Sequence, residues 1–235
     1  MGGICPLKPF CRFLRTLTVL VLLAGMLPSC GLIDKLGFDT YDYMSESVTQ
    51  THDANGETAA MIEELLMVLV TDSQILTTFD NMADAIPAYR DAVLEYLLAS
   101  DYAKYSGNTK LIERAMKHYP EYQITQVIPE LEFESMMYRC FGGDVMITHE
   151  DGNKFRYLPE AAVYVPMLAT TDHGYYADVT SLTETEKTYR VRFKVKSKPE
   201  AAGTPVESDE YFALVIKRED GTMYMKKLFL GSDVG

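Results

Sequence analysis

The spacing of the apolar residues changes once along this chain, and that change limits the folds open to it. From about residue 57 to residue 141, apolar side chains recur every three or four positions, as they do on helices packed by one face. After Gly142 and Gly143 they alternate with polar residues, which is the spacing of β-strands. Helices followed by a run of strands predict an α+β fold, with the helices packed on an antiparallel sheet. We expect a single domain over 56–230, with helices in about 57–141 and strands in about 145–230.

The expected helices begin and end at residues that commonly start or stop helices. Proline lacks a backbone N–H, so Pro87 is expected to kink or divide the second helix. In the third helix, Met116 is expected to face inward with its apolar neighbours. Gly142 is the usual kind of residue after a last turn. The predicted helices cover 57–70 after Asn55-Gly56, a segment from Asp80 or Asn81 onward, 109–118 after Gly107-Asn108, and 128–141 opened by Ile128-Pro129.

The strands are expected as an antiparallel meander. Glu150-Asp151-Gly152-Asn153 has the composition of a hairpin turn, and so do two later segments. The predicted strands are 145–148 with 154–158, then 161–168, then 175–183 with 189–198, and finally 211–218 with 223–230.

The first thirty residues have the layout of a secretory signal. Lys8, Arg12 and Arg15 form a basic region, and an uncharged apolar run follows over 17–27. That run is shorter than the roughly 20 apolar residues that span a bilayer. It ends in Leu27-Pro28-Ser29-Cys30, where proline and small residues suit a processing site.

Leu27, Ser29 and Cys30 resemble the lipobox of bacterial lipoproteins. In that family the cysteine is acylated and becomes the first residue of the mature protein. The resemblance implies a signal peptide over 1–29 and a lipidated tether over 30–55. It also implies a protein anchored to the outer face of the plasma membrane, or to the outer membrane of a Gram-negative host. An ordinary signal peptide with a chance cysteine and an uncleaved anchor are the alternatives.

The net charge of the chain limits the partners it can bind, and its cysteines limit the disulfides it can form. The formal charge of the chain is −12, and the first thirty residues carry three cations and no acid, so the remainder carries −15. Such a body repels anionic surfaces, which argues against a nucleic-acid partner. Cys140 is the only cysteine after Cys30, so we expect no intramolecular disulfide and a buried, inert thiol.

The order of helices and hairpins over about 80–230 resembles the NTF2-like and cystatin-like α+β domains of extracytoplasmic lipoproteins. A second likeness is to secreted inhibitors of cell-wall endopeptidases. In the first group, helices lie in the hollow of a bent sheet, and inward aromatic residues can line a pocket. The same residues would serve equally as core. The candidate pocket residues are Tyr157, Tyr164, Tyr176, Asp178 and Tyr189. Enzymes of the NTF2-like group place an acid–base pair in such a pocket, for which only Asp178 and His173 qualify here.

One strand is expected to carry a basic face. Between residues 189 and 196 apolar and cationic side chains alternate, which places Arg190, Arg192, Lys194 and Lys196 on one side. A basic sheet face on an acidic protein could receive an anionic wall polymer or an acidic envelope protein. The alternative is a solvated outer face whose cations pair with nearby acids.

No catalytic or cofactor motif is visible. The four histidines lack the spacing of metal ligands and are expected at the surface, and no phosphate-binding or nucleophile motif appears. The sequence therefore favours a lipid-anchored, non-enzymatic binding or interaction module of the cell envelope, with no cofactor. An inhibitor of cell-wall hydrolases, using the charged loop 199–209, and a small pocket enzyme are the alternatives.

Overall fold

The structure is a computed structural model that describes residues 42–70, 75–143, 146–168, 174–198 and 207–233. The chain divides into two compact units, 1–42 and 43–235, and every element below belongs to the second. The expected signal peptide, Cys30 and most of the loop 199–209 lie outside the described residues. Within the described ranges, no helix combines the length and apolar character needed to cross a bilayer.

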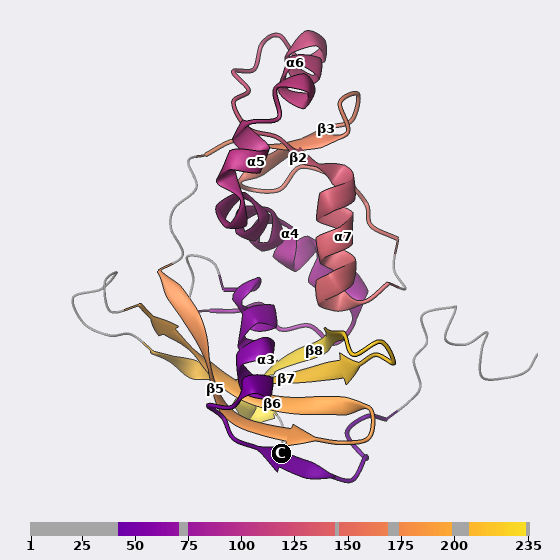
Figure 1. The fold of residues 1–235 in the computed structure, drawn as a ribbon, viewed down its shortest axis with the longest axis vertical. Helices are drawn as coiled ribbons and strands as arrows, with labels where there is room; N and C mark the ends of the chain where they lie inside the picture. The colour runs from indigo at the N-terminus through magenta and orange to yellow at the C-terminus, as the bar shows by residue number, and fades with distance from the viewer. Residues whose placement is uncertain (1–41, 71–74, 144–145, 169–173, 199–206, 234–235) are drawn as a thin grey trace, which may run out of the picture. The chain divides into compact units, whose positions relative to one another are not determined.

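A five-stranded antiparallel sheet forms one layer of this unit (Figure 1). Four of its strands follow one another along the chain and pair as neighbours, so the two late hairpins predicted from the sequence are confirmed. Side chains alternate between buried and partly exposed along the central strand, as the period of two predicts. The strands, in sheet order, are β1 (Gln50–His52), β5 (Tyr175–Glu184), β6 (Thr188–Ser197), β7 (Glu207–Lys217) and β8 (Met223–Leu230).

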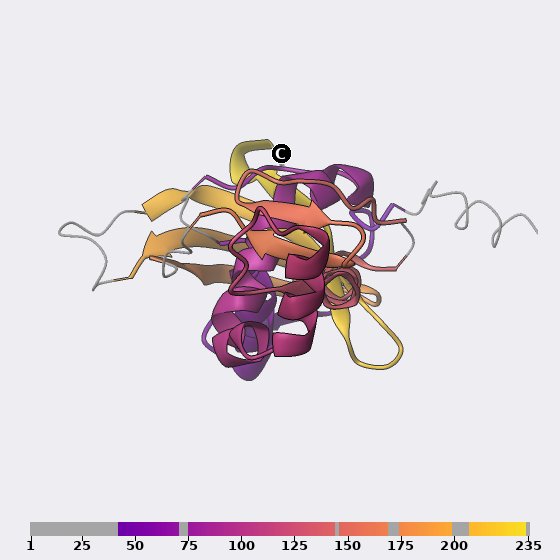
Figure 2. The ribbon, with the colours of Figure 1, turned by 90° about the horizontal axis from the view of Figure 1, so that it is seen from above.

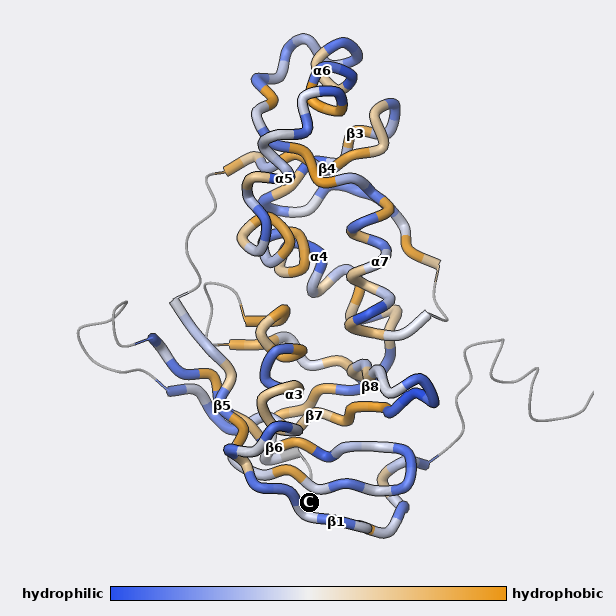
Figure 3. Tube along the Cα trace, in the orientation of Figure 1, coloured by the Kyte–Doolittle hydropathy of each residue, from blue (hydrophilic) through white to orange (hydrophobic). Residues whose placement is uncertain are grey.

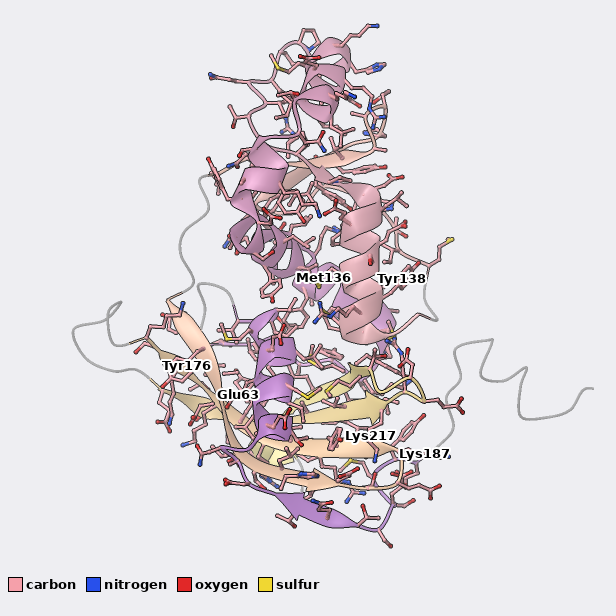
Figure 4. All side chains as sticks on the ribbon, viewed as in Figure 1. Glu63, Met136, Tyr138, Tyr176, Lys187 and Lys217 are labelled. Atoms are coloured by element: carbon pink, nitrogen blue, oxygen red, sulfur yellow. The ribbon has the colours of Figure 1, made fainter. Side chains whose placement is uncertain are left out.

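Helix α3 (Glu57–Met67) covers one face of this sheet. It begins after Gly56, as predicted, and its inner face is fully buried in the same core as the inward side chains of β6. Glu63 ties the helix to the sheet, because its Oε1 accepts a hydrogen bond from the Val179 backbone N–H at 3.0 Å (Figure 4). The hollow of the sheet is therefore filled with apolar side chains, among them Ile62, Leu66, Val191 and Phe193.

Strand β1 corrects the predicted boundary of the tether. Its three residues pair with the end of β5, and the Thr49 N–H donates to the Glu184 carbonyl at 2.8 Å. The folded unit therefore includes residues that the sequence assigned to the tether over 30–55. Strand β1 lacks apolar alternation, and nothing in its composition marks it as a strand.

The remaining helices are α4 (Met82–Ser100), α5 (Tyr102–Ser106), α6 (Thr109–His118) and α7 (Glu130–Phe141). Asn81 caps the start of α4, since its side chain accepts a hydrogen bond from the Asp84 N–H, and the helix runs without division through Pro87. Of the two predicted effects, a kink or a division, the division does not occur. Proline removes one backbone hydrogen bond near the start of the helix, whereas eleven of the 19 residues are buried and hold it in place. Met116 of α6 is 44% exposed, against the prediction that it faces inward.

Helices α4 and α7 lie side by side, and α7 also contacts β8 (Figures 1 and 2). Three aromatic rings join these elements. The Phe79 ring meets those of Tyr89 and Phe141 edge to face, with centroids 5.8 and 5.7 Å apart, and the Phe79 backbone pairs with that of Leu228 in β8. Helix α7 stops at Gly142, as predicted, and the backbone of this glycine has a φ of +94°.

A second, three-stranded sheet has the order β2 (Ile128–Pro129), β4 (Val163–Pro166) and β3 (Phe155–Leu158). A smaller core lies between this sheet and α6. The tube in Figure 3 shows apolar segments along these strands and polar segments at the turns.

The predicted hairpin of 145–148 with 154–158 is wrong. Strand β3 pairs with β4 instead, and the described residues 146–149 form no strand. The turn before β3 is held by α4, because Asp91 Oδ2 accepts the N–H groups of Asn153 and Lys154 at 2.7 and 3.2 Å. A Cβ on Gly152 would lie 2.0 Å from Asp91 Oδ1, so this glycine allows close approach to the helix.

Candidate functional site

The five predicted pocket residues do not form one pocket. Tyr157 and Tyr164 lie on the small sheet, whereas Tyr176, Asp178 and Tyr189 lie on the five-stranded sheet. Tyr164 is completely buried, and Asp178 Oδ2 forms an ion pair with Lys196 Nζ at 2.6 Å. Figure 4 shows Tyr176 on β5, apart from α7. The other predicted pocket acid–base residue, His173, lies outside the described residues.

Tyr157 and Tyr164 instead enclose His149. The imidazole is stacked on the Tyr157 ring, with centroids 4.9 Å apart. Its Nε2 donates to Glu134 Oε1 at 3.0 Å, since a carboxylate only accepts, and its Nδ1 lies 3.0 Å from the Tyr164 hydroxyl. Burial, and then the hydrogen bond to Glu130, raise the pKa of Tyr157 to about 12. These contacts join the loop before β3 to α7, and none of the pockets described below includes them.

A second polar cluster joins three strands of the large sheet. Glu184 accepts from His52 Nε2 at 2.7 Å and from Lys217 Nζ at 2.6 Å. The hydrogen bond from Lys217 is the main cause of a lowered pKa of Glu184. Lys217 also lies over the Tyr189 ring, 5.3 Å from its centroid (Lys217 is labelled in Figure 4). The side chains of His52 and His149 are each 16% exposed, so the expectation that every histidine lies at the surface is wrong for these two.

The predicted basic face exists, and its cations are paired. Arg192 bonds Glu210 at 2.9 Å, Lys194 bonds Glu207, and Lys196 bonds Asp178. Arg190 donates to the backbone carbonyls of Tyr43, Met44 and Glu46. The three ion pairs fit the alternative stated for this face, in which its cations pair with nearby acids.

An apolar groove lies between α3, α4, α7 and the β7–β8 turn, with a volume of about 430 Å³. We call it the methionine groove, because Met61, Met136 and Met223 line it from three different elements. Met136 and Tyr138 are labelled on α7 in Figure 4. The other lining residues are Glu64, Leu65, Val68, Tyr96, Ser135, Tyr138, Arg139, Cys140, Arg218, Gly221 and Thr222.

The wall of this groove is apolar and its charges lie at the edge. Burial raises the pKa of the Cys140 thiol to about 12, in agreement with the predicted inert thiol. Burial, followed by the nearby Glu64 carboxylate, raises the pKa of Tyr96. Arg139 and Glu64 form a loose, exposed ion pair with 3.7 Å between nitrogen and oxygen. The site is suited to an apolar ligand with a polar end.

Two further pockets are more polar. One of about 330 Å³ lies along the segment 121–126 and β4, and one of about 210 Å³ lies beside α4 near Asn153. Among the described residues, no group of three histidine, cysteine, aspartate or glutamate side chains is placed to hold a metal ion.

Sequence reasoning missed the methionine groove. By its spacing Met61 belongs to the apolar stripe of the helix predicted over 57–70, but the residue is 49% exposed. On α7, Met136, Arg139 and Cys140 follow the i, i+3, i+4 spacing of one helix face, which is the only sequence signal for this wall. Comparison of the chain with known protein families, with curated proteins and with solved structures gave no match.

Proposed function

We propose that this protein is a lipid-anchored, extracytoplasmic binding module, and that the methionine groove is its binding site. The signal-like segment and Cys30 support the anchor. The observation that supports ligand binding is the groove itself, because it is a half-open apolar cavity of a size that small ligands occupy. Methionine side chains are flexible and polarisable, so they adapt to apolar ligands of different shapes.

A filled sheet hollow supports a binding module rather than a pocket enzyme. The face of the sheet under α3 is packed with apolar side chains, and the Asp178 carboxylate forms an ion pair with Lys196. The alternative function, inhibition of cell-wall hydrolases, was expected to use the loop 199–209. Residues 199–206 of this loop lie outside the described residues, so the described contacts favour no hydrolase partner.

For the finer fold we propose the cystatin-like type over the NTF2-like type. Within the described part of the chain, one strand of the large sheet precedes α3, and it pairs at the edge beside β5. The next four strands then follow in order across the sheet, with α3 on one face. Under this proposal, residues 68–174 are an insertion between the helix and the second strand.

The test uses a neutral dye, N-phenyl-1-naphthylamine, which fluoresces when it enters an apolar site. The wild-type chain should enhance its fluorescence in a saturable way. Met61→Glu places a charge in the groove wall and should weaken binding at least roughly tenfold, since a charged group is costly to leave in an apolar contact.

Met116→Glu is the matched control. Met116 is also a half-exposed helix methionine, at 44% against 49% for Met61, and it lies outside the groove. This variant should bind the dye like wild type. Absence of saturable enhancement in the wild type, or equal binding by the two variants, would contradict the proposed site.

A further inference from the structure

We infer that the methionine groove takes a single-chain amphiphile with an anionic end, whose alkyl chain lies on the apolar wall and whose anion lies at Arg139 and Arg218. This inference rests on the proposed function and adds the class of ligand. Its basis is the charge at the edge of the groove. Among the described residues that line it, three are charged: two are arginines and one is Glu64.

Arg139 is placed to exchange its partner for a ligand. Its side chain on α7 is 65% exposed, and that of Glu64 on α3 is 66% exposed. Their separation of 3.7 Å is longer than a hydrogen bond. Exposed ion pairs of this kind are weak. A ligand carboxylate or phosphate at hydrogen-bond distance from Arg139 would therefore bind the guanidinium more strongly than Glu64 does.

Arg218 is held at the other side of the groove by neutral acceptors. Its guanidinium donates to the Tyr138 carbonyl at 3.1 Å and to Thr222 Oγ1 at 3.3 Å, and it stacks over the Tyr224 ring at 4.7 Å. Asp220 lies close in sequence and accepts from the Thr222 N–H and hydroxyl; it is not among the lining residues. These contacts fix the position of the cation, and a fixed guanidinium loses little freedom on binding an anion.

The size of the groove favours one alkyl chain over a docked helix. A volume of about 430 Å³ lies near the lower end of the range for small-molecule pockets. A helix in a groove requires anchors spread over two turns. The wall here is divided among α3, α4, α7 and the β7–β8 turn, and its α7 part covers only the short stretch from Ser135 to Cys140.

The experiment measures displacement of the neutral dye by laurate, dodecanol and dodecyltrimethylammonium, which carry similar alkyl chains and differ in charge. Each is used below its micellar concentration. Laurate should bind most tightly and the cation least. Arg139→Gln should weaken laurate roughly threefold to tenfold and leave dodecanol unchanged. Glu64→Gln should strengthen laurate, because it removes the competing carboxylate.

Arg156→Gln is the control for loss of one positive charge. Arg156 lies on β3 over the Tyr122 ring and outside the groove, so its loss should leave laurate binding at the wild-type value. Dodecyl phosphate in place of laurate separates the two anionic ends. Tighter binding of the phosphate would indicate a phospholipid-like ligand, and tighter binding of laurate a fatty acid.

The outcomes separate this inference from the proposed function. If laurate and dodecanol bind equally in wild type and in Arg139→Gln, the anionic end is refuted while the apolar site stands. If neither competitor nor the dye binds, the proposed function itself fails. Equal losses in Arg139→Gln and Arg156→Gln would show a general charge effect and would also refute the inference.

Discussion

Gly142→Ala tests how α7 is joined to the large sheet. Gly142 ends α7 with φ +94° and ψ 179°, a region that residues with a Cβ rarely occupy. A Cβ at this position would lie 2.9 Å from Tyr224 Cε2 on β8 and 3.3 Å from Met82 Sδ on α4. The substitution therefore introduces backbone strain and a steric clash at the meeting point of three elements.

The two effects have separate magnitudes. The backbone strain costs about 1–3 kcal/mol. Overpacking against Tyr224 and Met82 costs about 1–3 kcal/mol more, reduced where the tyrosine ring can move. We therefore expect Gly142→Ala to lower the free energy of unfolding by about 2–5 kcal/mol. For a unit of this size, that corresponds to a fall in melting temperature of roughly 5–15 °C.

Two glycines of the same chain separate strain from clash. Gly221 has φ +82°, and a Cβ there would meet no atom within 4 Å, so Gly221→Ala should show strain alone, about 1–2 kcal/mol. Gly143 has open space and no positive φ, so Gly143→Ala should be close to neutral. Chemical denaturation followed by circular dichroism measures all three. Equal stabilities of the Gly142 and Gly143 variants would refute the described junction of α7 with β8.

Four further predictions concern the anchor, the reactivity of the thiol, the response to reductant and an ion pair. Cys30→Ser should abolish metabolic labelling with palmitate, and unchanged labelling would rule out acylation at this residue. Because burial raises the pKa of the Cys140 thiol to about 12, Cys140 should resist alkylation at neutral pH in the folded chain and react after unfolding. Peptide mass mapping measures this reaction, and equal reaction in both states would contradict the burial of the thiol. Reductant should leave the melting temperature unchanged. Lys217 lowers the pKa of Glu184 in the folded state. The ionised carboxylate therefore stabilises the fold above the unfolded pKa of glutamate, about 4.3, and this stabilisation is lost as the pH falls through the folded pKa. Denaturation curves of wild type and Glu184→Gln should therefore differ most near neutral pH and converge in acid, whereas a constant difference would count against the pair.

The sequence predicted those elements whose signals are local. Gly142 and Asn81 mark helix ends, and the alternation in β6 marks a strand with one buried face. The period of two also predicted the late hairpins, because each turn joins neighbours in the sheet. Pro87 does not divide its helix, because its effect depends on the packing of the whole segment, which a single residue does not reveal.

The missed features depend on contacts between distant segments. The turn before β3 has the composition of a hairpin, yet Asp91 of α4 takes up its N–H groups and β3 pairs with β4. The candidate pocket failed for the same reason, since its residues were joined by composition alone and fall on two sheets. The methionine groove is made by elements that are far apart in the sequence, so only the fold brings Met61, Met136 and Met223 together.

Binding in the methionine groove is tested most directly by NMR of the methionine ε-methyl groups during titration with laurate. The expected result is saturable shifts confined to Met61, Met136 and Met223, which line the groove. Met146, which is 87% exposed and lies outside the groove, is the internal control and should not respond. Shifts at Met146 as large as those of the three lining methionines, or no shifts at the three, would contradict the assignment of the groove as the binding site.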